Sequence, residues 1–183
     1  MKFYNPEGLY FISFAVLGWL DVFIRNEYKE IFLESLRFCQ KNIGVEIHEY
    51  IMSSHLHLVF RSINGQKPEL LIGDLKRFTS KSIVTEIKEN PKESRKEFLL
   101  NFFLKEGLKS SNVTPYQFWR NDNKPIECWS NKVRWQKINY IHQNPVKAGL
   151  VFRAEDYRYS SAIDYSDEKG LLDHIVIFRM FDL

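Results

Sequence analysis

Two histidines one residue apart lie in the apolar stretch SSHLHLVF, residues 53–60. Neighbouring side chains of a strand point to opposite faces, so His55, His57 and Val59 share one face of a strand here. The leucines and the phenylalanine between them share the other face, which is typical of a core. Two imidazoles on one face of a rigid strand can direct their nitrogens to one point, as a divalent cation requires. The pair alone is a weak signal, since such histidines are more often structural.

A tyrosine and an asparagine stand together in a later segment, INYIHQNPVKAGL, residues 138–150. Tyr140 and Asn144 are four residues apart, which puts both on one face of a helix. A phenol is a nucleophile, and an amide oxygen with two imidazoles leaves coordination positions open for phosphate oxygens. The four residues therefore favour a metal-assisted nucleophilic site. The alternative is that Tyr140 is a half-buried packing residue.

The helix that carries this tyrosine is predicted over residues 131–143. Ser130 precedes it as an N-cap. The helix is expected to end before Pro145, because the residue ahead of a proline avoids the helical region. The histidine strand needs a partner, and alternation over residues 45–52 predicts one, with Val45, Ile47 and Ile51 on one face.

The remaining elements follow from apolar periodicity. The predicted segments are a strand at residues 9–17 and helices at residues 27–42, 68–89 and 97–108. The order strand, helix, hairpin, helix and further strand predicts an α+β fold, a ferredoxin-like antiparallel sheet with the helices packed on one face.

Length and composition favour one domain over residues 1–183, with a core at about 9–165 and a tail at 166–183. Cys39 and Cys128 are far apart and form no CxxC spacing, which argues against a disulfide framework or a cysteine zinc site. No apolar stretch is long enough to span a bilayer, and the N-terminus lacks the layout of a signal peptide. We therefore expect a cytoplasmic protein without a membrane partner.

The basic residues are concentrated in the middle of the chain. Residues 76–137 contain fourteen Lys and Arg against seven Asp and Glu, although the net charge of the whole chain is only +3. Such a region suggests a polyanion as partner, and is equally typical of solvated helix faces. The candidate phosphate contacts are Lys76, Arg77, Lys81, Arg120, Lys124, Arg134 and Lys137. Candidates for stacking on unpaired bases, each more often a core residue, are Phe118, Trp119, Trp129 and Trp135.

Taken together, these motifs are familiar. HLH after an aliphatic strand, followed by YIHQNPVKAGLV and then EDYRYSSA, resembles the HUH-class single-tyrosine transposases of insertion-sequence type, and most closely their REP-associated branch. The stretch QFWRNDNKPIE resembles what precedes the tyrosine helix in that branch. The resemblance covers roughly residues 9–165. It implies an HUH endonuclease core with the ferredoxin-like fold.

The resemblance implies a DNA transposase that nicks and joins single-stranded DNA through a 5′-phosphotyrosine. Carried onto this chain, it makes Tyr140 the catalytic nucleophile, with His55, His57 and Asn144 as ligands of Mg²⁺ or Mn²⁺. The partner would be single-stranded or hairpin DNA. Both a homodimer that exchanges helices and a monomer remain open. The family commonly has Pro-Asn before the first histidine, and Ser53-Ser54 in its place puts the fine geometry in question.

Two other functions remain open at this point. One is a catalytically inactive or domesticated protein that binds DNA hairpins. The other is a metal-dependent nuclease that uses water as nucleophile, with Tyr140 as a packing residue. An oligonucleotide cleavage assay separates the three, since only the transposase forms a covalent adduct.

Overall fold

The computed structural model describes residues 2–109 and 115–179. Its centre is an antiparallel sheet in the order β2-β3-β1-β4. The strands are β1 (Leu9–Phe14), β2 (Val45–Met52), β3 (Leu56–Ser62) and the short β4 (Ile126–Glu127). The register sets Ser13 opposite His57 and Ile51 on its other side, so the histidine strand lies between two neighbours.

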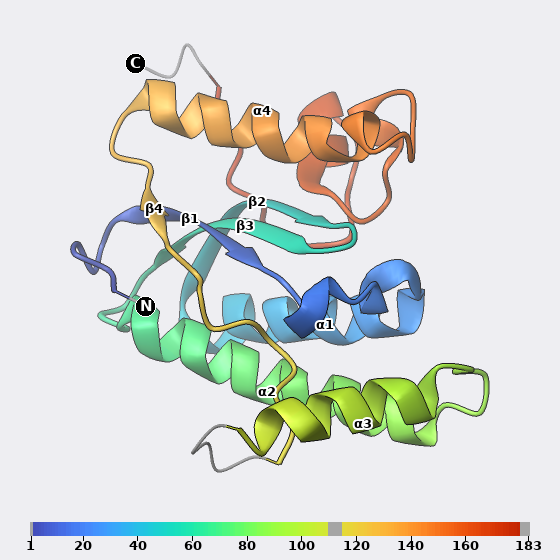
Figure 1. The fold of residues 1–183 in the computed structure, drawn as a ribbon. Helices are drawn as coiled ribbons and strands as arrows, with labels where there is room; N and C mark the ends of the chain where they lie inside the picture. Colours follow the sequence, from blue (N-terminus) through green and yellow to red (C-terminus); the bar gives the residue numbers. More distant parts are fainter. Residues whose placement is uncertain (1, 110–114, 180–183) are drawn as a thin grey trace.

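Among the described residues, α-helices lie on both sides of the sheet (Figure 1). They are α1 (Asn26–Phe38), α2 (Pro68–Glu89), α3 (Lys96–Gly107) and α4 (Asn131–Lys147). α1 and α2 lie on one face, α3 packs outside α2, and α4 lies on the other face beside the C-terminal segment that follows it. None of the helices described has both the length and the apolarity to cross a bilayer. The α+β antiparallel prediction is confirmed, but the expectation that the helices share one face is wrong for α4.

The strand β3 explains why both faces are covered, because its two faces are both apolar. Leu56, Leu58 and Phe60 belong to the large core under α1 and α2. Val59 belongs to a second, smaller core, which it shares with Phe11, Ile51, Cys128 and Ile141 of α4. The alternation predicted for β3 is therefore confirmed, and the face of His57 is the face that α4 covers.

The predicted alternation of β2 is wrong, because the strand contains a β-bulge. Ile47 pairs with Phe60 and Glu49 with Val59, so His48 is an extra residue. The bulge reverses the phase. Val45 and Ile47 face the large core, whereas Ile51 faces α4. Glu49 consequently faces α4 as well, since it bonds His142 of that helix.

The helix α4 begins after Ser130, whose hydroxyl accepts a hydrogen bond from the Val133 N–H, so the predicted N-cap is confirmed. The predicted end before Pro145 is wrong, since the helix runs through that proline to Lys147. The proline removes one N–H donor, but the next turn closes normally, with the Ala148 N–H donating to the Asn144 carbonyl at 3.0 Å. Tyr140 and Asn144 thus lie one turn apart in one continuous helix.

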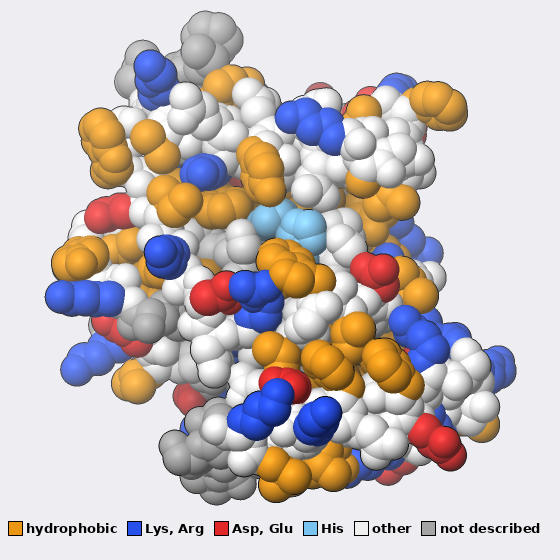
Figure 2. Space-filling view, in the orientation of Figure 1, with side chains coloured by type: hydrophobic (Ala, Val, Ile, Leu, Met, Phe, Trp, Pro, Cys, Tyr) orange, Lys and Arg blue, Asp and Glu red, His pale blue; other side chains and the backbone are white. Residues whose placement is uncertain are grey.

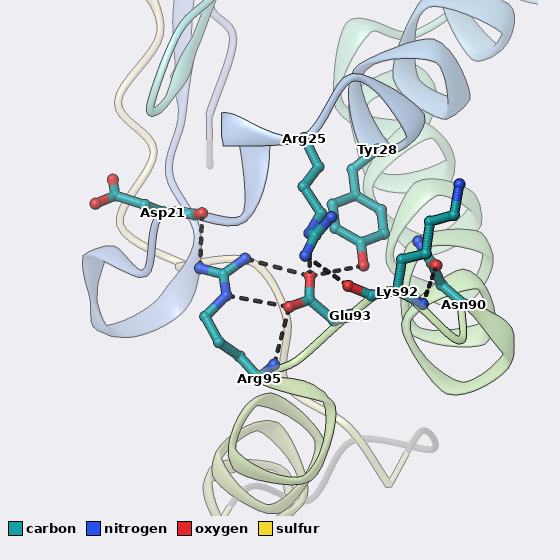
Figure 3. A network of polar contacts seen from close by, with 7 residues as sticks. All are labelled: Asp21, Arg25, Tyr28, Asn90, Lys92, Glu93 and Arg95. Carbon is teal, nitrogen blue, oxygen red and sulfur yellow. Dashed lines mark hydrogen bonds and ion pairs between the residues drawn. The ribbon is translucent and has the colours of Figure 1, made fainter.

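A buried carboxylate fastens the segment between β1 and α1 to the start of α3 (Figure 3). Glu93 pairs with Arg25 and Arg95 and accepts a hydrogen bond from Tyr28. Burial alone would raise the pKa of Glu93, but the bonds from Arg95 and Tyr28 hold it at about 2. Arg95 also donates to the carbonyl of Asp21. This network fixes the turn that follows β1 on the rest of the fold.

Candidate active site

The structure brings the predicted nucleophile to a predicted ligand within one chain. The hydroxyl of Tyr140 lies 3.5 Å from Nε2 of His57, and the two ring centroids are 5.1 Å apart. Phe11 stacks on His57 at 5.4 Å and meets Tyr140 edge-on at 5.9 Å. The histidine is buried, whereas Tyr140 is 44% exposed, so the phenol is open to a substrate from solvent.

The second histidine lies in the bend just before β3. The ring of His55 is 4.8 Å from that of His57, and the two planes are nearly perpendicular. His55 is half-buried. Figure 2 shows histidine side chains at the surface in the middle of the molecule's face, with hydrophobic side chains beside them. The fold therefore brings the two imidazoles side by side, as their spacing in the sequence predicted, although His57 itself is buried.

A serine holds one nitrogen of each ring. Ser54 Oγ lies 3.0 Å from Nδ1 of His55, and Ser13 Oγ lies 2.8 Å from Nδ1 of His57. In the tautomer whose Nδ1–H donates to the serine, the lone pair of Nε2 is free. Such partners typically orient histidine ligands of metals. In that tautomer both rings present Nε2 as the available donor.

Burial keeps both imidazoles uncharged. Burial is the main reason that the pKa of His57 is lowered to about 3, and the charge of Lys137 and the repulsion from His55 when that ring is protonated lower it as well. Burial also lowers the pKa of His55. A protonated imidazole cannot ligate a cation, so two neutral rings are ready ligands at neutral pH.

The predicted third ligand is tied to the turn that leads into the histidines. Oδ1 of Asn144 accepts a hydrogen bond from Ser53 Oγ at 3.0 Å, which leaves a second lone pair on that oxygen. Its neighbour Gln143 is exposed and makes no such contact to that turn. In residues 2–109 and 115–179, no three His, Cys, Asp or Glu side chains gather around a point where a metal could bind. Two neutral imidazoles and one amide oxygen fit a divalent ion, and their nitrogens suit Mn²⁺ better than Mg²⁺.

The helix α4 is fastened to β2 at two places on either side of Tyr140. Arg134 donates to Nδ1 of His48 at 2.7 Å, and His142 Nε2 lies 2.7 Å from the buried carboxylate of Glu49. That carboxylate also accepts a hydrogen bond from Ser161 at 2.9 Å. Sequence reasoning missed these contacts because the bulge that turns Glu49 toward α4 leaves no signal in the periodicity.

The predicted DNA contacts fall into four groups. Lys137 reaches the site, with Nζ 4.7 Å from the ring centroid of Phe11. Arg134 and Lys76 are engaged within the fold, the former on His48 and the latter on the carbonyl of Arg120 and the amide of Asn123. Exposed positions are taken by Arg77, Lys81 and Lys124. The guanidinium of Arg120 lies over the indole ring of Trp19, which is next to His55.

Among the aromatic candidates, Phe118 and Trp119 are buried in the large core and Trp129 is exposed. The sequence pattern missed Trp19, which lies edge-to-face with His55 at 6.2 Å and is 62% exposed. It also missed Ser13, which only interrupts an apolar strand in the sequence. The sequence signal for Ser13 was a polar residue within an apolar strand, and in the structure this residue pairs with His57.

Comparison with known proteins supports the fold. No family model matches the chain, and no curated protein matches it significantly in sequence. Among solved structures, the chain is similar to one described as a REP-associated tyrosine transposase bound to a REP hairpin, with a TM-score of 0.62. The match covers 100% of this chain and 93% of that one at 15% sequence identity. At that identity, the likeness establishes a shared α+β fold.

Proposed function

We propose that this protein is a tyrosine transposase that nicks and rejoins single-stranded DNA through a 5′-phosphotyrosine intermediate. The observation that carries the proposal is the 3.5 Å approach of the Tyr140 hydroxyl to Nε2 of His57. A packing tyrosine has no need of an open hydroxyl beside a buried, neutral histidine. The similar solved structure, a tyrosine transposase bound to a DNA hairpin, supports the same reading.

The residues around the phenol would bind the divalent ion that offsets the negative charge of the scissile phosphate. His55, His57 and Asn144 would hold a divalent ion, Mg²⁺ or Mn²⁺, which would polarise the phosphate and offset the charge of the transition state. Ser13 and Ser54 orient the imidazoles for this role, and Ser53 orients the amide. These three serines fix the donors before DNA arrives, so little reorganisation is needed.

The chemistry conserves the number of phosphodiester bonds. The oxygen of Tyr140 attacks phosphorus, a P–O(Tyr) bond forms, and the bond from phosphorus to the 3′-oxygen breaks. The phenol gives up its proton, and the leaving strand takes one up as a free 3′-OH. A 3′-OH of another strand then attacks the phosphotyrosine, which restores the phenol. No external energy source is needed.

Hairpin recognition belongs to the proposal too. The similar structure was solved with a REP hairpin, and this chain carries exposed cations on α2 and next to β4. Arg77, Lys81 and Lys124 are candidates for phosphate contacts there. Lys137 beside Phe11 is the candidate nearest the phenol.

A label-position experiment tests the proposal. Single-stranded oligonucleotides with a hairpin and randomised flanks are labelled at the 3′ end and incubated with the protein and Mn²⁺. Because a 5′-phosphotyrosine retains the downstream fragment, the 3′ label should move into a protein–DNA adduct that survives denaturing electrophoresis. Tyr140→Phe should abolish the adduct. Tyr4→Phe, at an exposed tyrosine 79% open to solvent, is the matched control and should retain it.

The other outcomes point to the other functions. Cleavage without an adduct, unchanged in Tyr140→Phe, would identify a nuclease that activates water. Hairpin binding without cleavage would identify a binding protein that lacks the chemistry. An adduct that persists in Tyr140→Phe would show that another residue is the nucleophile.

A further inference from the structure

Trp19 is an exposed aromatic residue in an unusual backbone conformation. Its side chain is 62% open to solvent. Its φ is +56°, directly after Gly18 with a φ of +68°. A bulky residue other than glycine rarely adopts a positive φ, and such strain is concentrated at ligand-binding positions. The backbone at Trp19 is therefore strained, and the side chain is not buried in a way that would compensate for this strain.

The surrounding chain holds the Trp19 turn rigidly. A Cβ on Gly18 would lie 2.7 Å from the ring of Phe102, so α3 presses directly against the turn. The Leu17 N–H donates to the carbonyl of Phe118 at 2.8 Å. The Trp19 N–H donates to the carbonyl of Val16 at 3.0 Å. The indole is thus presented from a fixed support.

Two groups flank the indole, and both suit DNA. The ring of His55, a proposed metal ligand, meets Trp19 edge-to-face at 6.2 Å. The guanidinium carbon of Arg120 lies 4.4 Å from the centre of the indole. Arg120 is in turn held by Asp122, whose carboxylate accepts from its Nε at 3.0 Å. An open aromatic surface and a fixed cation thus lie directly beside the place where a phosphate would bind.

We propose that Trp19, with Arg120, is a stacking platform for an unpaired base next to the scissile phosphate. This inference rests on the proposed function, since it concerns the DNA strand at the same site. Every base has a π-face, so an aromatic platform binds single strands with little sequence preference. Stacking would hold one nucleotide in place while its neighbour's phosphate meets Tyr140. Trp19 is then a positioning residue that touches the substrate outside the reacting bond.

A binding measurement without cleavage tests the platform. Fluorescence anisotropy in EDTA compares a labelled dT 12-mer with a 12-mer of abasic sugar-phosphate units, which has the same charge and no bases. The parent protein should bind the dT strand more tightly. Trp19→Ala should reduce this preference about tenfold, as expected for the loss of one stacked base, while its affinity for the abasic strand stays unchanged. Trp19→Phe should recover part of the preference.

Tyr4→Ala is the matched control. Tyr4 is also exposed, and Lys2 Nζ lies 4.7 Å from the centre of its ring. It differs from Trp19 in position, because it lies before the start of β1, whereas Ser13 and its partner His57 are near the end of that strand. This variant should keep the preference of the parent. Equal binding of both strands by the parent, or an unchanged preference in Trp19→Ala, would overturn the inference. A normal preference together with no Tyr140 adduct would instead overturn the proposed function and leave the platform standing.

A stability measurement provides a second readout. Trp19→Gly removes the indole and also relieves the positive φ. It should raise the melting temperature while losing the preference for bases, because the strain serves binding and not folding. A lowered melting temperature in Trp19→Gly would show that the indole supports the fold, and would overturn the inference.

Discussion

The hydroxyl of Ser53 donates a hydrogen bond to Oδ1 of Asn144 at 3.0 Å, and so joins the turn before the histidines to the tyrosine helix. The transposases that the sequence resembles commonly have Pro-Asn or a similar pair at the positions of residues 53 and 54. In this chain each serine contacts a site residue, with Ser54 on Nδ1 of His55. The departure from the pattern therefore supplies contacts that orient the site.

Removing the Ser53 hydroxyl should loosen the proposed third ligand. Ser53→Ala is expected to weaken Mn²⁺ binding about tenfold, the low end for loss of a group that orients a ligand, and to lower stability by about 1 kcal/mol. Isothermal titration calorimetry with Mn²⁺ measures the first effect. Ser166→Ala, at a serine that bonds only the carbonyl of Ile163 in its own turn, is the control. Equal Mn²⁺ affinity in Ser53→Ala and the parent would argue against Asn144 as a ligand.

Glu49 should contribute far more to stability than its neighbour on the same strand. It is fully buried and bonded to His142, Ser161 and Tyr165. Glu49→Ala removes the acceptor of these hydrogen bonds and should lower the free energy of unfolding, measured in urea, by about 3–5 kcal/mol. Glu46→Ala breaks a partly exposed pair with Arg61 and a 3.8 Å contact with His48, and should cost less than about 1 kcal/mol. Similar losses in both variants would contradict the importance of the buried network.

His48 should make the protein less stable in acid. Burial first, and then the charge of Arg134, lowers its pKa from 6.5 to about 4. Between these values the unfolded chain binds a proton that the folded protein does not, so stability rises with pH there. The neutral His48 therefore contributes about 3 kcal/mol to the free energy of unfolding above pH 6.5, relative to acid conditions, and this contribution is lost as the pH falls toward 4.

Urea unfolding at several pH values measures this slope. His48→Gln should make the slope less steep without abolishing it, because glutamine does not titrate whereas His57, with its pKa lowered to about 3, is still present. His174→Asn is the control, since it removes an exposed histidine and keeps a residue type that tolerates the φ of +59° at that position. An equally steep loss in His48→Gln would assign the acid sensitivity to other groups.

Lys137 should contribute to DNA binding as a phosphate contact. Its ammonium lies over Phe11, next to His57. Lys137→Gln should weaken binding of a dT 12-mer and reduce the slope of log K against log salt by about one. Lys132→Gln, an exposed lysine of the same helix and the same change of charge, should leave the slope unaltered. Equal slopes in both variants would mean that Lys137 acts only through net charge.

Patterns local in the sequence predicted most of the fold. The alternation in β3 placed His57 and Val59 correctly on the face that α4 covers, whereas His55 lies in the bend before the strand, and Ser130 marked the start of α4. What the sequence could not reveal depends on contacts between distant segments. The bulge at His48 is set by pairing with β3, and the passage of α4 through Pro145 depends on the packing of that helix on the sheet.

The site was predictable to a similar extent. Spacing and resemblance picked His57 and Tyr140, which the fold brings within 3.5 Å. The residues that contact the candidate ligands are ordinary serines, and only the register of β1 against β3 shows that Ser13 reaches His57. Trp19 was missed for a different reason, because a positive φ at a tryptophan has no sequence signature.

The bonds that join α4 to His48 and Glu49 of β2 bear on how many copies of the chain are needed to form one site. In this fold the hydroxyl of Tyr140 lies beside His57 of the same chain, so the proposed function predicts a specific activity that does not fall on dilution. Mixing a copy that lacks Tyr140 with a copy that lacks His57 should restore nothing, because neither can lend its helix to the other without breaking these bonds.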